Sequence, residues 1–264
     1  TDPGKLRPNN EDAVFCDAGL GLAILADGMG GYNAGEVASG MATTLLAESL
    51  PRTLGDADPQ ALDDSGMRAV HRQLLACIEA ANAEIYFAAQ SNPRYFGMGT
   101  TLVLAWFYDN QLSVAHIGDS RLYRWRENSL ERLTRDHSLL QEQLDSGMIT
   151  PSQARVFHAR NLVTRALGVG PAVEPELRNV EVRAGDTYLL CSDGLSDMVD
   201  DAEIGKALCE FVDDPAMVAD CLVQMANSNG GRDNISVIVV KVQEGLAAAT
   251  GRWQKRPSCL GQNR

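Results

Sequence analysis

Acidic residues stand beside predicted turns in five short segments that are far apart in this sequence. A pair of hard divalent cations needs about six oxygen ligands each, so a chain that binds them must bring distant carboxylates together. Any one Asp-Gly or Gly-Gly pair is typical of a turn alone. Together, the five segments predict one metal site with oxygen ligands and a fold that converges on it. The segments are Arg7-Pro8-Asn9-Asn10-Glu11-Asp12, Asp27-Gly28-Met29-Gly30-Gly31, Gly118-Asp119-Ser120-Arg121, Ser192-Asp193-Gly194 and Gly231-Arg232-Asp233-Asn234.

Length and hydrophobicity favour one large domain with a full core. The chain has 264 residues, of which 45% are hydrophobic. Its longest clear apolar run, Leu20–Ala26, is far shorter than the roughly 20 residues that a membrane helix needs. The N-terminal residues are polar, so no export signal is visible. The six cysteines form no C-x-x-C pair, which favours a reducing compartment. We therefore expect a cytoplasmic monomer.

The charge balance argues against nucleic acid as a partner. The chain has 23 basic and 35 acidic residues, a formal charge of −12. Binding to a phosphate backbone needs stripes of Lys and Arg, which this sequence lacks. Bound cations would offset part of the negative charge, although most surface carboxylates need no explanation beyond solubility.

The first half of the chain reads as strand, glycine turn, two helices and a hairpin. A continuous apolar strand over Leu20–Asp27 runs into Gly28, and helical periodicity follows over Gly35–Leu50. A Pro-, Asp- and Gly-rich stretch over Pro51–Gly66 breaks the pattern before a second long helix, from Met67 to a point before Pro93. Strands over Thr100–Tyr108 and Gln111–Ile117 are joined by Asp109-Asn110, which predicts a hairpin.

The second half adds another hairpin and a closing strand–helix series. Because hairpins pair strands antiparallel and leave no crossover helices, the fold class predicted is α+β rather than a parallel βαβ series. Residues 148–161 form a polar excursion that could act as a flap. We expect one folded domain over residues 1–242 and a disordered tail over residues 243–264, which is Ala- and Gly-rich and basic. The other predicted elements are strands over Leu122–Arg126, Leu130–Leu133, Thr187–Cys191 and Ile235–Val242, and helices over Asp136–Ser146, Asp201–Phe211 and Pro215–Ser228.

The five acidic segments, in this order, resemble the motifs of the metal-dependent serine/threonine protein phosphatases of type 2C, in their short bacterial form. Three further segments share the resemblance, namely Gly35-Glu36-Val37-Ala38-Ser39, Gly99-Thr100-Thr101 and Thr164-Arg165-Ala166-Leu167-Gly168. The match runs over about residues 4 to 242. The resemblance implies two stacked antiparallel β-sheets with a pair of helices on each outer face, an α-β-β-α sandwich. It also implies hydrolysis of phosphoserine and phosphothreonine, in opposition to a bacterial Ser/Thr kinase.

The resemblance assigns a binuclear Mn²⁺ or Mg²⁺ centre. Asp27 would bridge the two ions, the Gly28 carbonyl would complete one ligand set, and Asp193 and Asp233 would hold the other ion. Such a centre activates hydroxide for in-line attack on phosphorus and clamps the phosphoryl oxygens. No nucleophilic side chain is then needed. Glu11 would act through a bound water.

The remaining matched residues receive supporting roles. Arg7 would capture the phosphate, since a planar guanidinium suits bidentate binding of the dianion. Asp119 would hold a third, weaker metal together with Asp193, and Asp12 would orient ligands rather than bind an ion. Asn234 would fix the loop that carries Asp233. Each could instead be an ordinary turn or surface residue.

The family pattern is incomplete at the position of a general acid. Some members have a histidine directly after the Asp-Gly pair, and many bacterial members have one three residues later, but here these positions hold Met29 and Tyr32. The donor of the leaving-group proton therefore stays open. The four histidines, His71, His116, His137 and His158, show no H-x-x-x-H pair and are interpreted as structural or exposed rather than as metal ligands.

Two other classes of function stay open on the sequence. One is a catalytically silent, metal-binding regulatory module of the same fold, and the other is a metal-dependent phosphodiesterase or nuclease. The complete set of Asp27, Asp193 and Asp233 argues against the first, and the acidic charge argues against the second. Ser120 and Ser192 lack a G-x-S-x-G elbow, which argues against a serine hydrolase.

Overall fold

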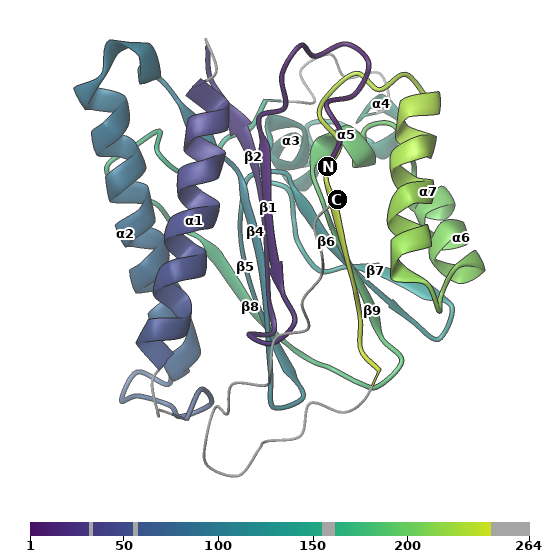
Figure 1. Ribbon diagram of the computed structural model, residues 1–264, viewed down its shortest axis with the longest axis horizontal. Coiled ribbons are helices and arrows are strands. Elements are labelled where there is room, and N and C mark those ends of the chain that lie inside the picture. Colours follow the sequence, from purple (N-terminus) through teal and green to yellow (C-terminus); the bar gives the residue numbers. More distant parts are fainter. Residues whose placement is uncertain (32–33, 55–57, 155–161, 244–264) are drawn as a thin grey trace.

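Two antiparallel β-sheets lie face to face, and a pair of helices covers the outer side of each sheet (Figure 1). The computed structural model describes residues 1–31, 34–54, 58–154 and 162–243. In Figure 1 the layers run from α2 and α1, through the two sheets, to α7 and α6. This is the predicted α+β sandwich.

The first sheet has six strands in the order β1-β2-β4-β5-β8, with the short β3 paired to β2. Every pairing in it is antiparallel. The strands are β1 Asp12–Asp17, β2 Leu22–Met29, β3 Gly99–Thr100, β4 Leu102–Tyr108, β5 Gln111–Ile117 and β8 Glu176–Glu181.

The second sheet has four strands in the order β10-β9-β6-β7, again all antiparallel. Its central strand β9 is buried at all of its positions, as a strand covered on both faces must be. The strands are β6 Arg121–Arg126, β7 Ser129–Arg132, β9 Thr187–Cys191 and β10 Val237–Lys241.

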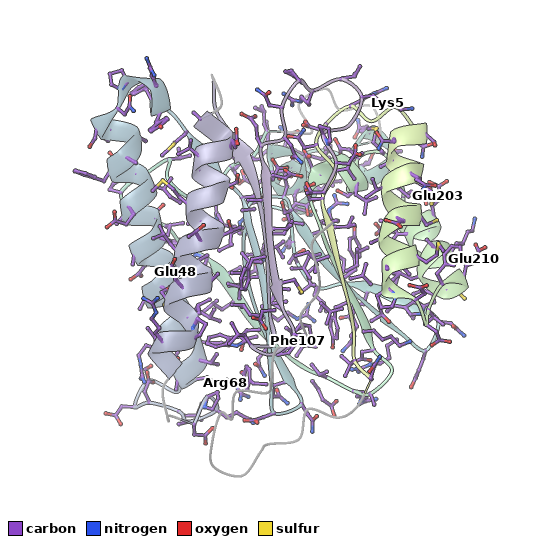
Figure 2. All side chains as sticks on the ribbon, viewed as in Figure 1. Lys5, Glu48, Arg68, Phe107, Glu203 and Glu210 are labelled. Atoms are coloured by element: carbon purple, nitrogen blue, oxygen red, sulfur yellow. The ribbon has the colours of Figure 1, made fainter. Side chains whose placement is uncertain are left out.

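Three apolar clusters hold the layers together. One lies between helices α1 and α2 and the first sheet, one between the two sheets, and one between the second sheet and helices α5 to α7. Phe107 belongs to the middle cluster, where its ring meets Tyr188 edge to face at 5.1 Å. Figure 2 labels it between the helix layers, whereas Glu203 and Glu210 lie in the outer layer formed by α6 and α7. The helices are α1 Ala34–Leu54, α2 Ala69–Ser91, α3 Leu139–Asp145, α4 Pro151–Ala154, α5 Asp193–Ser196, α6 Asp201–Glu210 and α7 Pro215–Ser228, with a 3₁₀ turn η1 at Pro93–Tyr95.

Both predicted hairpins are confirmed. The turn residues Asp109 and Asn110 have φ of 45° and 56°, the left-handed geometry that matches the twist of a tight hairpin. Glu127 and Asn128 have the same left-handed geometry in the turn between β6 and β7, with φ of 50° and 59°. The two long helices, the strand over Thr187–Cys191 and the helix over Pro215–Ser228 are confirmed as well.

Several boundaries differ from those predicted. Helix α1 continues through Pro51 to Leu54, so the break predicted at Pro51 is wrong. Helix α3 begins at Leu139 rather than Asp136, because Ser138 caps it and accepts a hydrogen bond from the Gln141 backbone N–H. The segment Ser192-Asp193-Gly194 leads into the short helix α5 rather than a simple turn.

Strands β1 and β8 were not predicted. Both lie at sheet edges and are largely not buried: β1 has only four apolar residues between two Asp residues, and β8 has isolated apolar residues among polar ones. Of the predicted excursion, residues 155–161 lie outside the described residues, as do residues 244–264 of the predicted tail and Tyr32. No helix in the described part of the chain is both long and apolar enough to span a bilayer.

Candidate metal centre

The centre is built around Asp27, near the end of the central strand β2. Its backbone carbonyl accepts hydrogen bonds from the Thr101 N–H at 2.8 Å and from the Thr100 hydroxyl at 2.9 Å, and its N–H donates to the Thr101 hydroxyl at 3.0 Å. These bonds satisfy the backbone of Asp27 and leave the carboxylate to point elsewhere. The next residue, Gly28, pairs with Thr100 and donates its N–H to the Glu11 carbonyl at 3.1 Å.

Strand β1 brings Asp12 directly opposite Asp27 in the register of the first sheet. One oxygen of Asp12 accepts a hydrogen bond from the Ser192 hydroxyl at 2.9 Å, which ties the first sheet to the end of β9 in the second. The other oxygen, Oδ1, is buried and has no hydrogen-bond partner. A buried carboxylate oxygen without a partner is costly, so this atom calls for a bound water or a cation in the site.

The second sheet contributes Asp193 and Asp233. Asp193 is the first residue of α5, directly after β9, and Asp233 lies in the loop before β10. The two segments touch at the backbone, because a Cβ on Gly194 would come within 2.0 Å of the Asn234 carbonyl oxygen. Only glycine permits this approach, which explains the Asp-Gly pair at this point.

Arg7 lies at the edge of the centre, paired with Asp233. Its Nη2 is 2.6 Å from Asp233 Oδ2, and the side chains are 51% and 30% exposed. The side chain of Asn234 bonds the backbone of the N-terminal segment and so joins that segment to the loop that carries Asp233. It accepts from the Glu11 N–H at 2.8 Å and donates to the carbonyls of Pro3 and Asn9.

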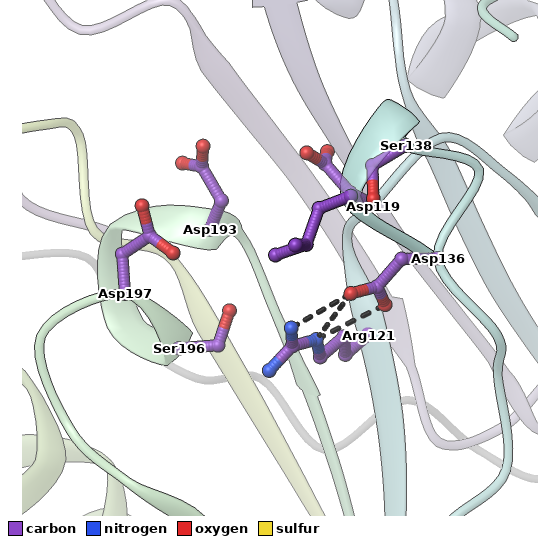
Figure 3. Close-up of a pocket in the computed structure, with 8 residues that line it drawn as sticks. Asp119, Arg121, Asp136, Ser138, Asp193, Ser196 and Asp197 are labelled. Atoms are coloured by element: carbon purple, nitrogen blue, oxygen red, sulfur yellow. Dashed lines mark hydrogen bonds and ion pairs between the residues drawn. The ribbon is translucent and has the colours of Figure 1, made fainter. Parts of the chain in front are cut away.

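Asp119 lies in the turn between β5 and β6 and faces α5 across a small cavity of about 80 Å³. Figure 3 shows Asp193 and Ser196 of α5 with the following Asp197 on one side, and Asp119, Asp136 and Ser138 on the other. Arg121 forms a two-pronged ion pair with Asp136 at 2.7 to 3.2 Å, so its guanidinium is already neutralised. Asp119, Asp193 and Asp197 bring three further carboxylates to the same cavity.

The electrostatics show that these carboxyl groups converge. Burial raises the pKa of Asp27 well above its usual range, and the charges of Asp12, Asp193, Asp119 and Asp233 raise it further. Burial and neighbouring carboxylates also raise the pKa of Asp193.

The pKa values of carboxyl groups at the rim of the site are raised as well. Burial raises the pKa of Asp119 to about 7, with Asp136 as the main repelling charge, and burial raises the pKa of Glu11. Like-charged groups this close cannot all ionise unless cations join them. The donor set consists of carboxylates and the Gly28 carbonyl, the hard oxygen ligands that Mg²⁺ and Mn²⁺ prefer. The residues present therefore fit a cluster of divalent cations.

Sequence reasoning missed the groups that hold these carboxylates in place. Ser192, Thr101 and Asp136 act through hydrogen bonds or an ion pair across the fold, which no local pattern reveals. The position of Asp197 offered a weak signal for a place near Asp193, because residues four apart lie on the same face of a helix. The metal-binding roles given to Asp27, Gly28, Asp193, Asp233, Glu11 and Asp119, and the phosphate-binding role of Arg7, stay predictions.

Comparison with known proteins identifies the family. The sequence model of the protein phosphatase 2C family matches residues 8–229. The serine/threonine protein phosphatase PstP of Mycobacterium tuberculosis is 43% identical over 242 residues, which cover 92% of this chain and 44% of PstP. The serine/threonine phosphatase stp of Listeria monocytogenes is 38% identical over 244 residues, with 91% of this chain and 93% of stp covered. The chain thus spans less than half the length of PstP but nearly all of stp.

Solved structures agree with the sequence comparisons. A crystal structure of M. tuberculosis PstP matches with a TM-score of 0.81 at 41% identity, covering 92% of this chain and 96% of that one. The PstP catalytic domain in complex with two manganese ions matches with a TM-score of 0.79 at 40% identity and the same coverage. Fold, acidic centre and sequence agree, and the chain belongs to the protein phosphatase 2C family.

Proposed function

We propose that this chain is a protein serine/threonine phosphatase that hydrolyses phosphoserine and phosphothreonine at the acidic centre. The observation that carries the proposal is the convergence of Asp27, Asp193, Asp119 and Asp233 beside the guanidinium of Arg7, where burial and the charges of neighbouring carboxylates raise the pKa of Asp27 and of Asp193. The relatives named above are serine/threonine phosphatases, and one of them binds two manganese ions.

Asp27, the Gly28 carbonyl, Asp193 and Asp233 would hold two Mn²⁺ or Mg²⁺ ions, with Glu11 acting through water. Asp119 and Asp193 would hold a third. When bound, such ions lower the pKa of a shared water and clamp the phosphoryl oxygens.

The protein's own residues supply binding and position. Arg7 lies where it can reach a phosphate held at the Asp233 side of the centre, and its planar fork suits two phosphoryl oxygens. Asp12 braces Asp27 from the opposite strand, and its own carboxylate is held by the Ser192 hydroxyl.

The hydroxyls nearby are engaged in structure rather than chemistry. Ser192 is fully buried, and its hydroxyl donates to Asp12 and accepts from the Ser236 N–H at 3.0 Å. Ser120 is also buried, and its hydroxyl is bonded to that of Thr101 at 2.8 Å. Neither is available as a nucleophile, which is consistent with direct attack by water. The thioether of Met29 cannot donate a proton, so we propose that solvent protonates the departing alkoxide.

The substrates would be phosphorylated proteins, and the partner would be a bacterial Ser/Thr kinase whose action the phosphatase reverses. We expect a cytoplasmic monomer with no affinity for nucleic acid.

A panel of substrates tests this assignment. With Mn²⁺ present, we expect phosphate release from phosphothreonine and phosphoserine peptides and from an aryl phosphate, and far slower cleavage of bis(4-nitrophenyl) phosphate. Comparable rates on the diester, or cleavage of duplex DNA, would favour the phosphodiesterase or nuclease class. Tight Mn²⁺ binding without turnover of any monoester would favour the silent regulatory module.

A further inference from the structure

Two buried histidines stack on each other outside the acidic centre. His116 of β5 and His137, just before α3, are 2% and 8% exposed, and their ring centroids are 4.7 Å apart at an interplanar angle of 19°. The carboxylate of Glu176 on β8 faces both rings, with Oε2 3.8 Å from His116 Nε2 and 3.6 Å from His137 Nε2. Within the described part of the chain, this trio has the composition and spacing of a metal site.

The hydrogen bonds of the rings argue against a metal at this place. Nε2 of His116 lies 2.8 Å from the Arg135 carbonyl oxygen, which can only accept, so this nitrogen carries a hydrogen. Nδ1 of His137 accepts from the Gly118 N–H at 3.2 Å, which places the hydrogen of the neutral ring on Nε2. Burial lowers the pKa of His137 to about 4, so the ring is neutral near pH 7. Neither nitrogen that faces Glu176 has a free lone pair for a cation.

The same bonds join two segments of the chain. The His116 ring donates to Arg135, the Gly118 N–H donates to the His137 ring, and the His137 N–H donates to the Gly118 carbonyl at 2.8 Å. We call His116, Gly118, Arg135 and His137 the histidine clasp. It connects the end of β5 to the segment that leads into α3, and the Glu176 carboxylate lies 3.6 Å from Nε2 on the outer side of the His137 ring.

The clasp holds the residue directly before Asp119. Gly118 has φ of 97°, and a Cβ at this position would come within 2.7 Å of the Thr101 side chain. Its backbone is therefore wedged between Thr101 on one side and His137 on the other. Because the Thr101 hydroxyl also accepts from the Asp27 N–H, the clasp and Thr101 together set the place of Asp119 relative to Asp27.

The turn needs such restraint because its carboxylate is repelled by its surroundings. Asp119 is 9% exposed and faces Asp136, Asp197 and Asp193 around the cavity. Before cations bind, this repulsion favours an outward movement of the turn. The two hydrogen bonds between His137 and Gly118 oppose that movement.

We propose that His137 is a positioning residue for Asp119, and that its ring acts as a hydrogen-bond acceptor which holds the Gly118–Asp119 turn in the geometry that binds the third, weakest cation. The inference rests on the proposed function in one respect, the role of Asp119 as a cation ligand. It assigns a role to a histidine that binds neither metal nor substrate.

The test uses Mn²⁺ binding, measured by calorimetry and by electron paramagnetic resonance, beside the Mn²⁺ dependence of turnover. His137→Leu removes the acceptor at similar volume, and we expect it to weaken the weakest Mn²⁺ site roughly three- to tenfold, the effect of about one hydrogen bond. His137→Asn places a carbonyl oxygen near the position of Nδ1 and should restore most of the affinity. The two tighter sites should be unchanged in both variants.

Matched variants separate the possible failures. Asp119→Asn should abolish the weakest site, and if it leaves all Mn²⁺ binding unchanged, the proposed third cation site is wrong. If Asp119→Asn abolishes that site while a folded His137→Leu binds Mn²⁺ like wild type, the positioning role is overturned.

Two further measurements cover the remaining outcomes. Should His137→Leu fail to fold, His137→Gln, whose oxygen extends beyond the Nδ1 position, should weaken the site while His137→Asn preserves it. Equal affinity in the Gln and Asn variants would contradict the proposal. Stoichiometric Zn²⁺ binding that Glu176→Ala abolishes would show that the trio is a metal site and would overturn the tautomers assigned here.

Discussion

At the scale of single residues, Arg7 and Asp233 form a contact that substrate must compete with. The guanidinium lies 2.6 Å from the Asp233 carboxylate, so binding of a phosphate dianion exchanges one anionic partner for another. Because the side chain is half exposed, this exchange costs little, as for other exposed ion pairs. In the role predicted for it, Arg7 would exchange Asp233 for phosphate at little cost.

Replacement of Arg7 tests this role. We expect Arg7→Ala to raise KM for a phosphothreonine peptide at least about tenfold with a smaller loss of kcat, because the contact is made in the ground state as well as in the transition state. Arg7→Lys keeps the charge but not the fork, and should lie between wild type and Arg7→Ala. Steady-state kinetics at saturating Mn²⁺ decide the matter. A loss of kcat with unchanged KM would place Arg7 in stabilisation of the transition state.

Sequence reasoning found the charged residues of the centre but missed the hydroxyl groups that hydrogen-bond to them. Asp27, Asp193 and Asp233 stand in recognisable Asp-Gly or Asp-Asn contexts, and the structure brings them together. Ser192 and Thr101 could not be found in this way, because their hydroxyls act on residues 180 and 74 positions away. Such contacts follow from strand register, which the sequence determines only through the whole fold.

At the scale of elements, strong local patterns were predictable and edge elements were not. The hairpin at Asp109-Asn110 and helix α7 behind its Asp214 cap and Pro215 follow from local chemistry. Strand β8 presents alternating exposed positions and gains its partner only from β5. The segment Asp136–Ser138 reads as helical, yet it lies before α3, because Asp136 pairs with Arg121 and His137 bonds to Gly118.

Helix α6 offers an independent test of local chemistry far from the centre. Asp200 and Glu203 form a capping box, in which each side chain accepts from the other residue's backbone N–H. We expect Asp200→Ala to lower the free energy of unfolding by about 1 kcal/mol, as measured by urea denaturation, because it leaves a helix N–H without its partner. Turnover at saturating Mn²⁺ should be unchanged. A variant as stable as wild type would show that solvent replaces the cap at no cost.

At the scale of the whole molecule, the fold forces carboxylates together that repel one another without cations. Burial raises the pKa of Asp119 to about 7, and burial raises that of Asp27 and Asp193 as well. In the unfolded chain these groups titrate near pH 4. The folded state therefore binds more protons than the unfolded state between these values, and its stability must fall as the pH rises.

Protein kept free of divalent cations by a chelator should show this fall of stability with pH directly. With excess chelator, the contribution of these carboxyl groups to the free energy of unfolding is fully present below about pH 4. It is lost as the pH rises through about 7, the folded pKa of Asp119. Thermal unfolding across this range should show a smaller fall in Asp119→Asn, and saturating Mn²⁺ should remove most of it in wild type. A melting temperature that is independent of pH in chelator would mean that the carboxylates do not repel one another as the fold implies.

The central claim is that the converging carboxylates form a cation centre that hydrolyses phosphate esters. Its most direct test is the initial rate of phosphate release from a phosphothreonine peptide in excess chelator and after addition of Mn²⁺, for wild type, Asp27→Asn and Asp193→Asn. We predict no release in chelator, full recovery with Mn²⁺ in wild type, and loss of most turnover in both folded variants, since each removes charge from the cation ligands without changing core volume. Full wild-type activity in chelator, or near-native turnover of either variant at matched Mn²⁺, would contradict it.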